Sequence, residues 1–166
     1  MCNPSAERIE KEDEMPREIF TDFPKIEAVL KRNYICTLAL EDDGAPYLFA
    51  MNYGYREGVL YFHSSPRGKK ALLFREKKRA GFWVLDHAEL YGERENPCSM
   101  TMHYESVTGK AEIVIVADRR EKNEALNLIT AQAGGRDGTD FSPESLDGVL
   151  ILKGMIIESS GKRSFK

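Results

Sequence analysis

The residues best suited to chemistry occupy one stretch, Tyr61-Phe62-His63-Ser64-Ser65-Pro66-Arg67-Gly68-Lys69-Lys70. Its first residues are typical of a strand, and Pro66 and Gly68 separate them from a helical pattern over 69–76. A histidine and two hydroxyls therefore precede a helix whose first turn is basic. Free backbone N–H groups at a helix N-terminus and lysine ammonium groups both favour an anion, so this spacing predicts a phosphate site.

The charge of this region is opposite to that of the whole chain. Residues 67–79 carry seven basic side chains and one acidic one, a local charge of +6, whereas the 166-residue chain has a net charge of −3. A solvated basic helix face with weak affinity for RNA explains the same pattern. The balanced total argues against a protein that binds nucleic acid over its whole surface, and we expect no nucleic-acid partner.

Several well-known site motifs are absent. The P-loop pattern fails because position 63 is His and Lys69 is followed by Lys70, and the glycines of 134–138 lack the GxGxxG spacing. No serine lies in a GxSxG setting, and no cysteine lies beside an evident base. The possible metal ligands also lack zinc-site spacing, so we expect no metal. They are His63, His87, His103, Cys36 and Cys98.

The elements that must position these residues are mainly strands. Apolar alternation and β-branched or aromatic residues predict six of them, at 34–40, 47–55, 59–63, 79–85, 99–116 and 149–157. Short turns at 42–46 and 56–58 join the first three strands as antiparallel neighbours. The run 99–116 is long for one strand, and Gly109 indicates a bend or bulge within it.

Helices are few and lie between the strands. Asp22 is placed to cap a helix with Pro24 in its first turn, and Asp118 to cap a longer helix that ends at Gly134. Ser142 begins a single helical turn. Hairpins replace the βαβ crossovers of a Rossmann fold, so the order predicts an antiparallel sheet or barrel with peripheral helices.

The ends of the chain and its thiols bear on organisation and location. Residues 1–15 are acidic and poor in apolar side chains, which predicts a flexible arm before one domain at 16–166. The N-terminus resembles neither a signal nor a transit peptide, and no apolar run reaches membrane-spanning length. Three widely spaced cysteines are typical of reduced thiols. We therefore expect a cytoplasmic protein without a membrane partner.

Aromatic residues are concentrated in the first half of the chain. Most are expected in the core of the strands, which is their ordinary place in β proteins. An aromatic cleft beside a phosphate anchor also suits a planar ring cofactor, and composition does not separate the two. The residues concerned are Tyr34, Tyr47, Phe49, Tyr53, Tyr55, Tyr61, Phe62, Phe82 and Trp83.

The order of several segments resembles the pyridoxamine 5′-phosphate oxidase-related flavoproteins, and within them the branch of Nim-type 5-nitroimidazole resistance proteins. The resemblance covers about residues 15–163. It is carried by Pro46, Asn52-Tyr53, Leu60–Ser64, Gly68–Lys70, Leu73, Tyr104–Ala111 and Ile156–Lys162. It implies a six-stranded antiparallel Greek-key split β-barrel that forms a homodimer and binds FMN, or alternatively FAD, between the subunits.

The resemblance also implies a set of cofactor-binding residues, with His63 as a candidate catalytic residue near the flavin ring or a simple hydrogen-bonding group at a strand end. Tyr104 and Ser106 would approach from the partner chain or a neighbouring strand. The full set comprises Ala50, Met51, Asn52 and Tyr53 along the ring, Phe62, His63 and Ser64 toward the ribityl chain, Lys69 and Lys70 at the phosphate, and Tyr104 and Ser106.

The implied function is an FMN-dependent oxidoreductase that passes electrons from NAD(P)H to a small acceptor such as a nitro compound or quinone. A flavin- or haem-binding protein of the same fold without strong turnover is an alternative. Pyridoxamine 5′-phosphate oxidation is a weaker one, because the C-terminal residues 161–166 do not supply the basic substrate motif of that enzyme.

Overall fold

The computed structural model describes residues 17–92, 95 and 100–164, so the acidic segment 1–15, Cys2 and Cys98 lie outside it. The described chain forms seven strands and four helices. In order they are β1 (Arg17–Phe20), α1 (Phe23–Arg32), β2 (Ile35–Asp42), β3 (Ala45–Arg56), β4 (Val59–Ser64), α2 (Lys69–Glu76), β5 (Arg79–Tyr91), β6 (Thr101–Val116), α3 (Arg119–Gln132), α4 (Pro143–Asp147) and β7 (Leu150–Ser164). No helix in these residues is both long enough and apolar enough to cross a membrane.

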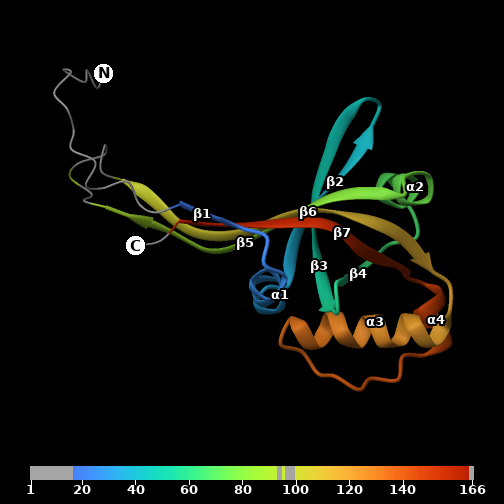
Figure 1. The fold of residues 1–166 in the computed structure, drawn as a ribbon. Coiled ribbons are helices and arrows are strands. Elements are labelled where there is room, and N and C mark those ends of the chain that lie inside the picture. The colour runs from blue at the N-terminus through green and yellow to red at the C-terminus, as the bar shows by residue number, and fades with distance from the viewer. Residues whose placement is uncertain (1–16, 93–94, 96–99, 165–166) are drawn as a thin grey trace.

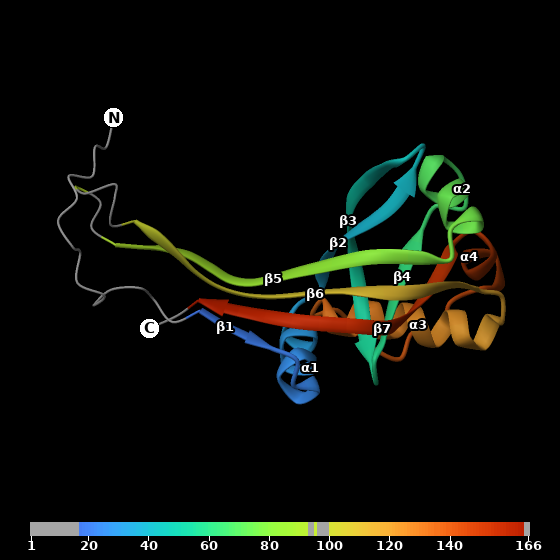
Figure 2. The ribbon, with the colours of Figure 1, turned by 45° about the horizontal axis from the view of Figure 1, so that its top comes forward.

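Six strands close into a barrel. The sheet order is β1-β7-β4-β3-β2-β5-β6, and β6 pairs again with β7, which completes the ring. Every pairing is antiparallel, so the expected mainly β, six-stranded antiparallel barrel is confirmed. Figures 1 and 2 show helices around the barrel and a ribbon of β5, β6, β7 and β1 that extends away from it.

The seventh strand, β1, was not expected from the sequence. It pairs with the end of β7, from Arg17↔Ser164 to Phe20↔Gly161. Only Phe20 of its four residues is buried, so no alternation of apolar side chains marks it as a strand. Its pairing partner is more than a hundred residues away, and only the fold brings the two together.

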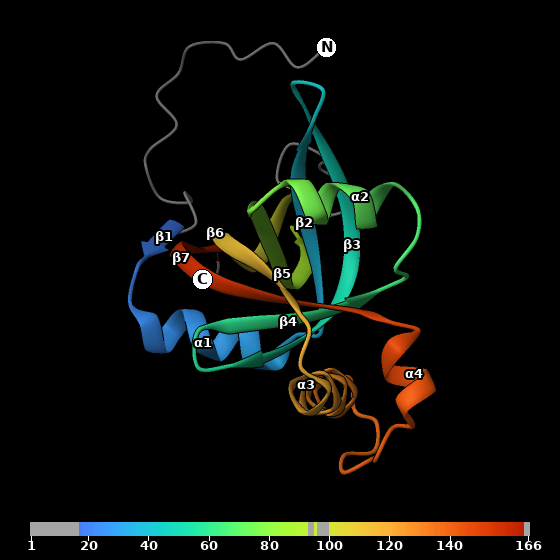
Figure 3. The same cartoon turned by 90° about the vertical axis from the view of Figure 1, so that its right-hand side faces the viewer.

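Two buried clusters hold the domain together. The larger fills the barrel with inward residues of the strands and the buried faces of α1 and α2. The smaller lies between α3 and the outside of β4 and β7, where Ile129 of α3 packs with Tyr61 and Ile151. Figure 3 shows α3 beneath the barrel, with α2 on the opposite side beside the β2–β3 hairpin.

The predicted helix caps are confirmed. Asp22 accepts a hydrogen bond from Lys25 N (3.1 Å), and Asp118 accepts one from Glu121 N (2.8 Å). Each satisfies a backbone donor that the first helical turn would otherwise leave unpaired. In contrast, α2 begins at Gly68 with a φ of 89° and has no side-chain cap.

The register of β6 with β7 shifts next to Gly109, where Lys110 pairs with Glu158 and Ala111 with Ile156. The extra residue of this bulge is Ile157 of β7, so the bulge lies on the strand opposite the predicted one. The strands β5 and β7 are longer than predicted. The residues Gly161-Lys162-Arg163, which lie beyond the strand predicted at 149–157, are part of β7.

An ion network explains how β5 and β7 extend beyond their predicted ends through polar residues. Glu105 of β6 is only 3% exposed and accepts hydrogen bonds from Arg32 Nη2 (2.5 Å) and Arg163 Nε (2.9 Å). Arg32 also donates to Asp86 on β5 (2.7 Å). Buried charges are stable only when paired in this way, and a period-two apolar pattern does not reveal such pairing.

Candidate functional site

The barrel is split between β3 and β4. These strands pair only from Arg56↔Val59 to Tyr53↔Phe62. Beyond that point β3 continues as far as Ala45, and among the described strands it pairs there with β2 alone. Asn52 and His63 are the first residues after the last pair, so they stand where the two strands separate.

The open edge of β3 offers backbone hydrogen-bonding groups. Tyr53 N donates to Tyr34 O (2.9 Å), on the side of β2. Because N–H and C=O groups alternate along a strand, those of Ala50 and the N–H of Asn52 point to the opposite, open edge. The amide and carbonyl groups along a flavin ring need partners of this kind.

The side chains predicted on β3 divide between two faces. Ala50 and Asn52 are exposed, whereas Met51 and Tyr53 are buried in the core. The Tyr53 hydroxyl donates to Leu30 O (2.7 Å), and burial raises the pKa of this phenol. The backbone groups of Met51 and Tyr53 point toward β2, so neither their side chains nor their backbone face the open edge.

The predicted residues of β4 divide in the same way. His63 is exposed at the end of the strand, while Phe62 is fully buried and Ser64 nearly so. Phe62 packs near Tyr53, with a distance of 6.4 Å between ring centroids. Of these three side chains, His63 is therefore the one available to a ligand outside the core.

The predicted phosphate lysines lie along the neighbouring part of β3. Lys69 Nζ is 5.0 Å from the centroid of the Tyr47 ring, and Lys70 Nζ is 5.3 Å from that of Phe49. Phe49 also packs edge-on against Phe74 of α2, with centroids 5.7 Å apart. The aromatic residues of β3 thus hold the basic, uncapped start of α2 beside the open edge.

The spacing along β3 suits a cofactor with a ring and a phosphate. Ala50 and Tyr47 are three residues apart, which is about 10 Å along a strand. A ring at the Ala50–Asn52 edge and a phosphate at Lys69 would be joined across that span by a ribityl chain. Cations and free helix N–H groups at one end and open-edge backbone groups at the other suit a cofactor that carries both a phosphate and a planar ring.

Tyr104 and Ser106 lie elsewhere in the barrel. They belong to β6, which is three strands away from β3 around the ring in either direction. Ser106 is opposite Lys162 of β7, whose Nζ is 5.8 Å from the centroid of the Tyr104 ring. Within one chain, the structure therefore does not bring these two residues to the open edge.

Trp83 was expected in the core with most other aromatic residues, but it is 45% exposed. It lies on the outer face of β5, between Thr37 of β2 and Thr108 of β6. Phe82 and Val84, on either side of Trp83, are buried. Alternation along the strand therefore places Trp83 on the outer face. Leu85 of β5, Ile35 of β2 and Leu48 of β3 are further exposed apolar residues.

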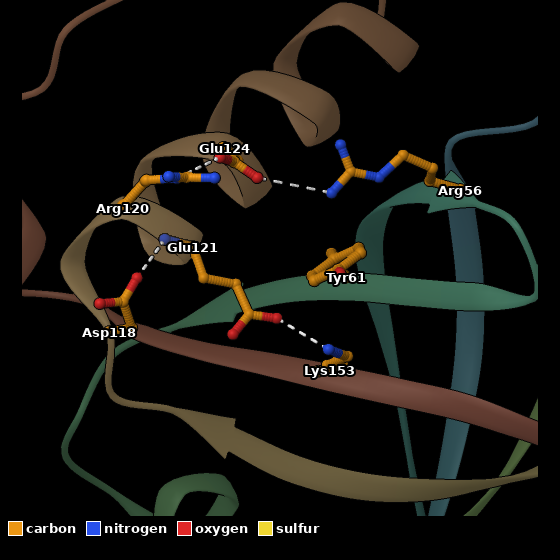
Figure 4. A pocket seen from close by; sticks show the side chains of 7 residues that line it. All are labelled: Arg56, Tyr61, Asp118, Arg120, Glu121, Glu124 and Lys153. Carbon is orange, nitrogen blue, oxygen red and sulfur yellow. Dashed lines mark hydrogen bonds and ion pairs between the residues drawn. The ribbon is translucent and has the colours of Figure 1, made fainter.

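A separate polar hollow of about 440 Å³ lies at the start of α3 (Figure 4). Its charged side chains pair with one another, as in Lys153–Glu121 (2.9 Å) and Arg120–Glu124 (3.1 Å). The lining residues are Arg56, Tyr61, Asp118, Arg120, Glu121, Glu124 and Lys153, none of them a predicted site residue. The hollow therefore offers no unpaired group that calls for a ligand.

Comparisons with solved structures find the same fold in several bacterial proteins, two of which are described as FAD-binding. A Bacteroides thetaiotaomicron protein assigned provisionally to 5-nitroimidazole antibiotic resistance matches with a TM-score of 0.78 and 25% identity over 90% of this chain and 89% of its own. An FAD- and haem-binding protein from Mycobacterium smegmatis matches with a TM-score of 0.73 and 21% identity over 89% and 74%. An FAD-binding protein from Mesorhizobium loti matches with a TM-score of 0.69 and 19% identity over 91% and 100%.

A search of curated proteins found no match. The family model described as pyridoxamine 5′-phosphate oxidase matches residues 23–163, which include the whole six-stranded barrel except the last residue of β7. The chain therefore belongs to the pyridoxamine 5′-phosphate oxidase family.

Proposed function

We propose that this protein is an FMN-dependent oxidoreductase that binds the cofactor at the open edge of β3. The observation that supports it most is the combination at that edge of unpaired strand and the uncapped, basic start of α2. The names of similar proteins, which include FAD- and haem-binding ones, support a flavin.

When bound, FMN would supply the redox chemistry, taking two electrons as hydride from NAD(P)H and passing them to a small acceptor such as a quinone or nitro compound. The protein's part is then to bind and orient. Lys69, Lys70 and the first N–H groups of α2 hold the phosphate. The backbone of Ala50 and Asn52 orients the ring, and His63 is placed beside it at the end of β4.

We further propose that the site is completed in a homodimer. The exposed face of β2 and β5 around Trp83 lies between β3 on one side and β6 on the other. A two-fold axis through that face would bring β6 of the partner against β3. Tyr104 and Ser106 would then reach the ring from the second subunit.

Pyridoxamine 5′-phosphate oxidation is less well supported for this chain. Among the described C-terminal residues, Arg163 donates to the buried carboxylate of Glu105 (2.9 Å). Its guanidinium therefore already has a structural role, which leaves it poorly placed to bind a substrate phosphate.

The test compares binding of FMN with binding of riboflavin, which lacks the phosphate. Replacing both lysines (Lys69→Met with Lys70→Met) should weaken FMN binding roughly 10- to 100-fold, because two charge-assisted hydrogen bonds are lost. Riboflavin binding should change little. Calorimetric titration of the apoprotein measures both affinities.

Lys77→Met is the matched control, since Lys77 lies at the other end of α2 and pairs with Glu41. It should leave both affinities within about twofold of the original protein. Equal losses for FMN and riboflavin would overturn the phosphate assignment. Absence of flavin binding together with a Soret band on haem addition would replace the proposal with a haem-binding role.

A further inference from the structure

The acidic tip of the β2–β3 hairpin contacts the basic helix α2 through two ion pairs. The Asp42 carboxylate pairs with the Lys69 ammonium, and the Glu41 carboxylate pairs with Lys77. The hydrogen bond from Lys69 to Asp42 raises the pKa of that lysine. An acid of the chain itself thus contacts the lysine that the proposed function assigns to the flavin phosphate.

The two acids differ in their other contacts. Glu41 also accepts a hydrogen bond from Gly44 N (2.7 Å), and so it helps to hold the hairpin turn. Asp42 makes no other side-chain hydrogen bond within the described residues. Its carboxylate contributes to Lys69 what a phosphate oxygen would contribute, namely a negatively charged acceptor at hydrogen-bonding distance.

We propose that Asp42 occupies the position of the flavin phosphate on Lys69 and competes with it, so that Asp42 sets how strongly this protein prefers a phosphorylated flavin. The inference rests on the proposed function. A phosphate that binds Lys69 must displace this carboxylate or accept a like charge beside it, and both reduce affinity. Riboflavin has no phosphate, so this competition does not change its affinity.

Asp42→Asn tests this by removing the charge while keeping the shape of the side chain. We expect FMN to bind the apoprotein roughly 3- to 10-fold more tightly, with riboflavin affinity unchanged. Glu41→Gln is the matched control, because it removes an equal charge from the same hairpin but not from Lys69. It should change the FMN affinity less than twofold.

A double-mutant cycle separates this competition from general electrostatics. In the Lys69→Met background, Asp42→Asn should no longer alter the ratio of FMN to riboflavin affinity. Weaker FMN binding by Asp42→Asn would show that the carboxylate positions Lys69 instead, and would overturn the proposal. An equal gain in Glu41→Gln would overturn it as well.

These outcomes leave the proposed function standing, since FMN still binds. Failure of the original protein and of every variant to bind either flavin would overturn both. Circular dichroism of each variant checks that the barrel is intact.

Discussion

Cys36 is a thiol enclosed by the barrel, on β2 opposite Met51 of β3. Burial raises the pKa of this thiol from 9.0 to about 12, because a thiolate inside the core would lose its hydration. Burial likewise raises the pKa of Tyr55 to about 12, with smaller effects of neighbouring acids. These groups remain protonated in the folded protein at pH values where the unfolded chain ionises.

The folded protein should therefore lose stability as the pH rises above about 9. In that range the native state binds more protons than the unfolded state, so the free energy of unfolding falls with increasing pH. Between pH 8.5 and 10.5, Cys36 should account for about 1–2 kcal/mol of the fall. Urea unfolding under reducing conditions measures it, with Cys36→Ala as the comparison. Identical pH dependence in both proteins would contradict the assignment.

At the scale of residues, the candidate site shows how much a contiguous sequence motif can predict about which residues face a ligand. The predicted run Ala50 to Tyr53 is on a strand, so consecutive side chains point to opposite faces. Ala50 and Asn52 are exposed and Met51 and Tyr53 are buried. The motif thus predicts where the site lies, and the strand geometry indicates that Ala50 and Asn52, but not Met51 and Tyr53, face it.

At the scale of elements, the position of α3 depends on a close approach to β3. A Cβ added at Gly54 would lie 2.7 Å from Ile129 N and 2.8 Å from the carbonyl carbon of Leu128, both in the helix backbone. Gln132 holds the other end of the helix, since its Nε2 donates to Leu30 O (2.9 Å) and its Oε1 accepts from Tyr55 N (2.6 Å). The helix cannot move away without losing these bonds.

Gly54→Ala should therefore destabilise the protein by about 2–4 kcal/mol, because the methyl group meets backbone that cannot rotate aside. Gly81→Ala is a suitable control, since its added Cβ would make an ordinary contact of 3.6 Å with the Ala39 side chain. It should change stability by less than about 1 kcal/mol. Chemical denaturation compares the two, and equal effects would show that the helix shifts at little cost.

At the scale of the whole molecule, the exposed Trp83 face and the separation of β3 from β6 both support the proposed homodimer. One chain holds both halves of the predicted site on opposite parts of its barrel. Large exposed apolar side chains grouped on a sheet mark an interaction surface. The proposed homodimer accounts for both features, because the face is covered and each site receives residues from two chains.

Trp83→Glu should convert the homodimer into a monomer and weaken FMN binding at least about tenfold, since a charge in the interface is desolvated without a partner. Light scattering coupled to gel filtration measures the mass. Val114→Glu serves as control, because Val114 is comparably exposed on β6 but six residues away from Thr108, which lies beside Trp83. A dimer that survives Trp83→Glu would place the interface elsewhere.

Much of this protein was determined by local sequence alone. Strand period, turn glycines and capping residues act over a few positions, so the barrel strands and the caps at Asp22 and Asp118 could be predicted. The basic start of α2 was equally local. These features require no knowledge of which segments meet in space.

The tertiary structure alone decided how distant segments meet. The pairing of β1 with β7, the ion network around Glu105 and the contact of Asp42 with Lys69 each join residues far apart in the sequence. Their stability comes from burial and charge pairing that exist only after the chain has closed on itself. For the same physical reason, the sequence could only predict the residues of the site, and the closed barrel was needed to show that Tyr104 and Ser106 lie three strands away from the open edge of β3.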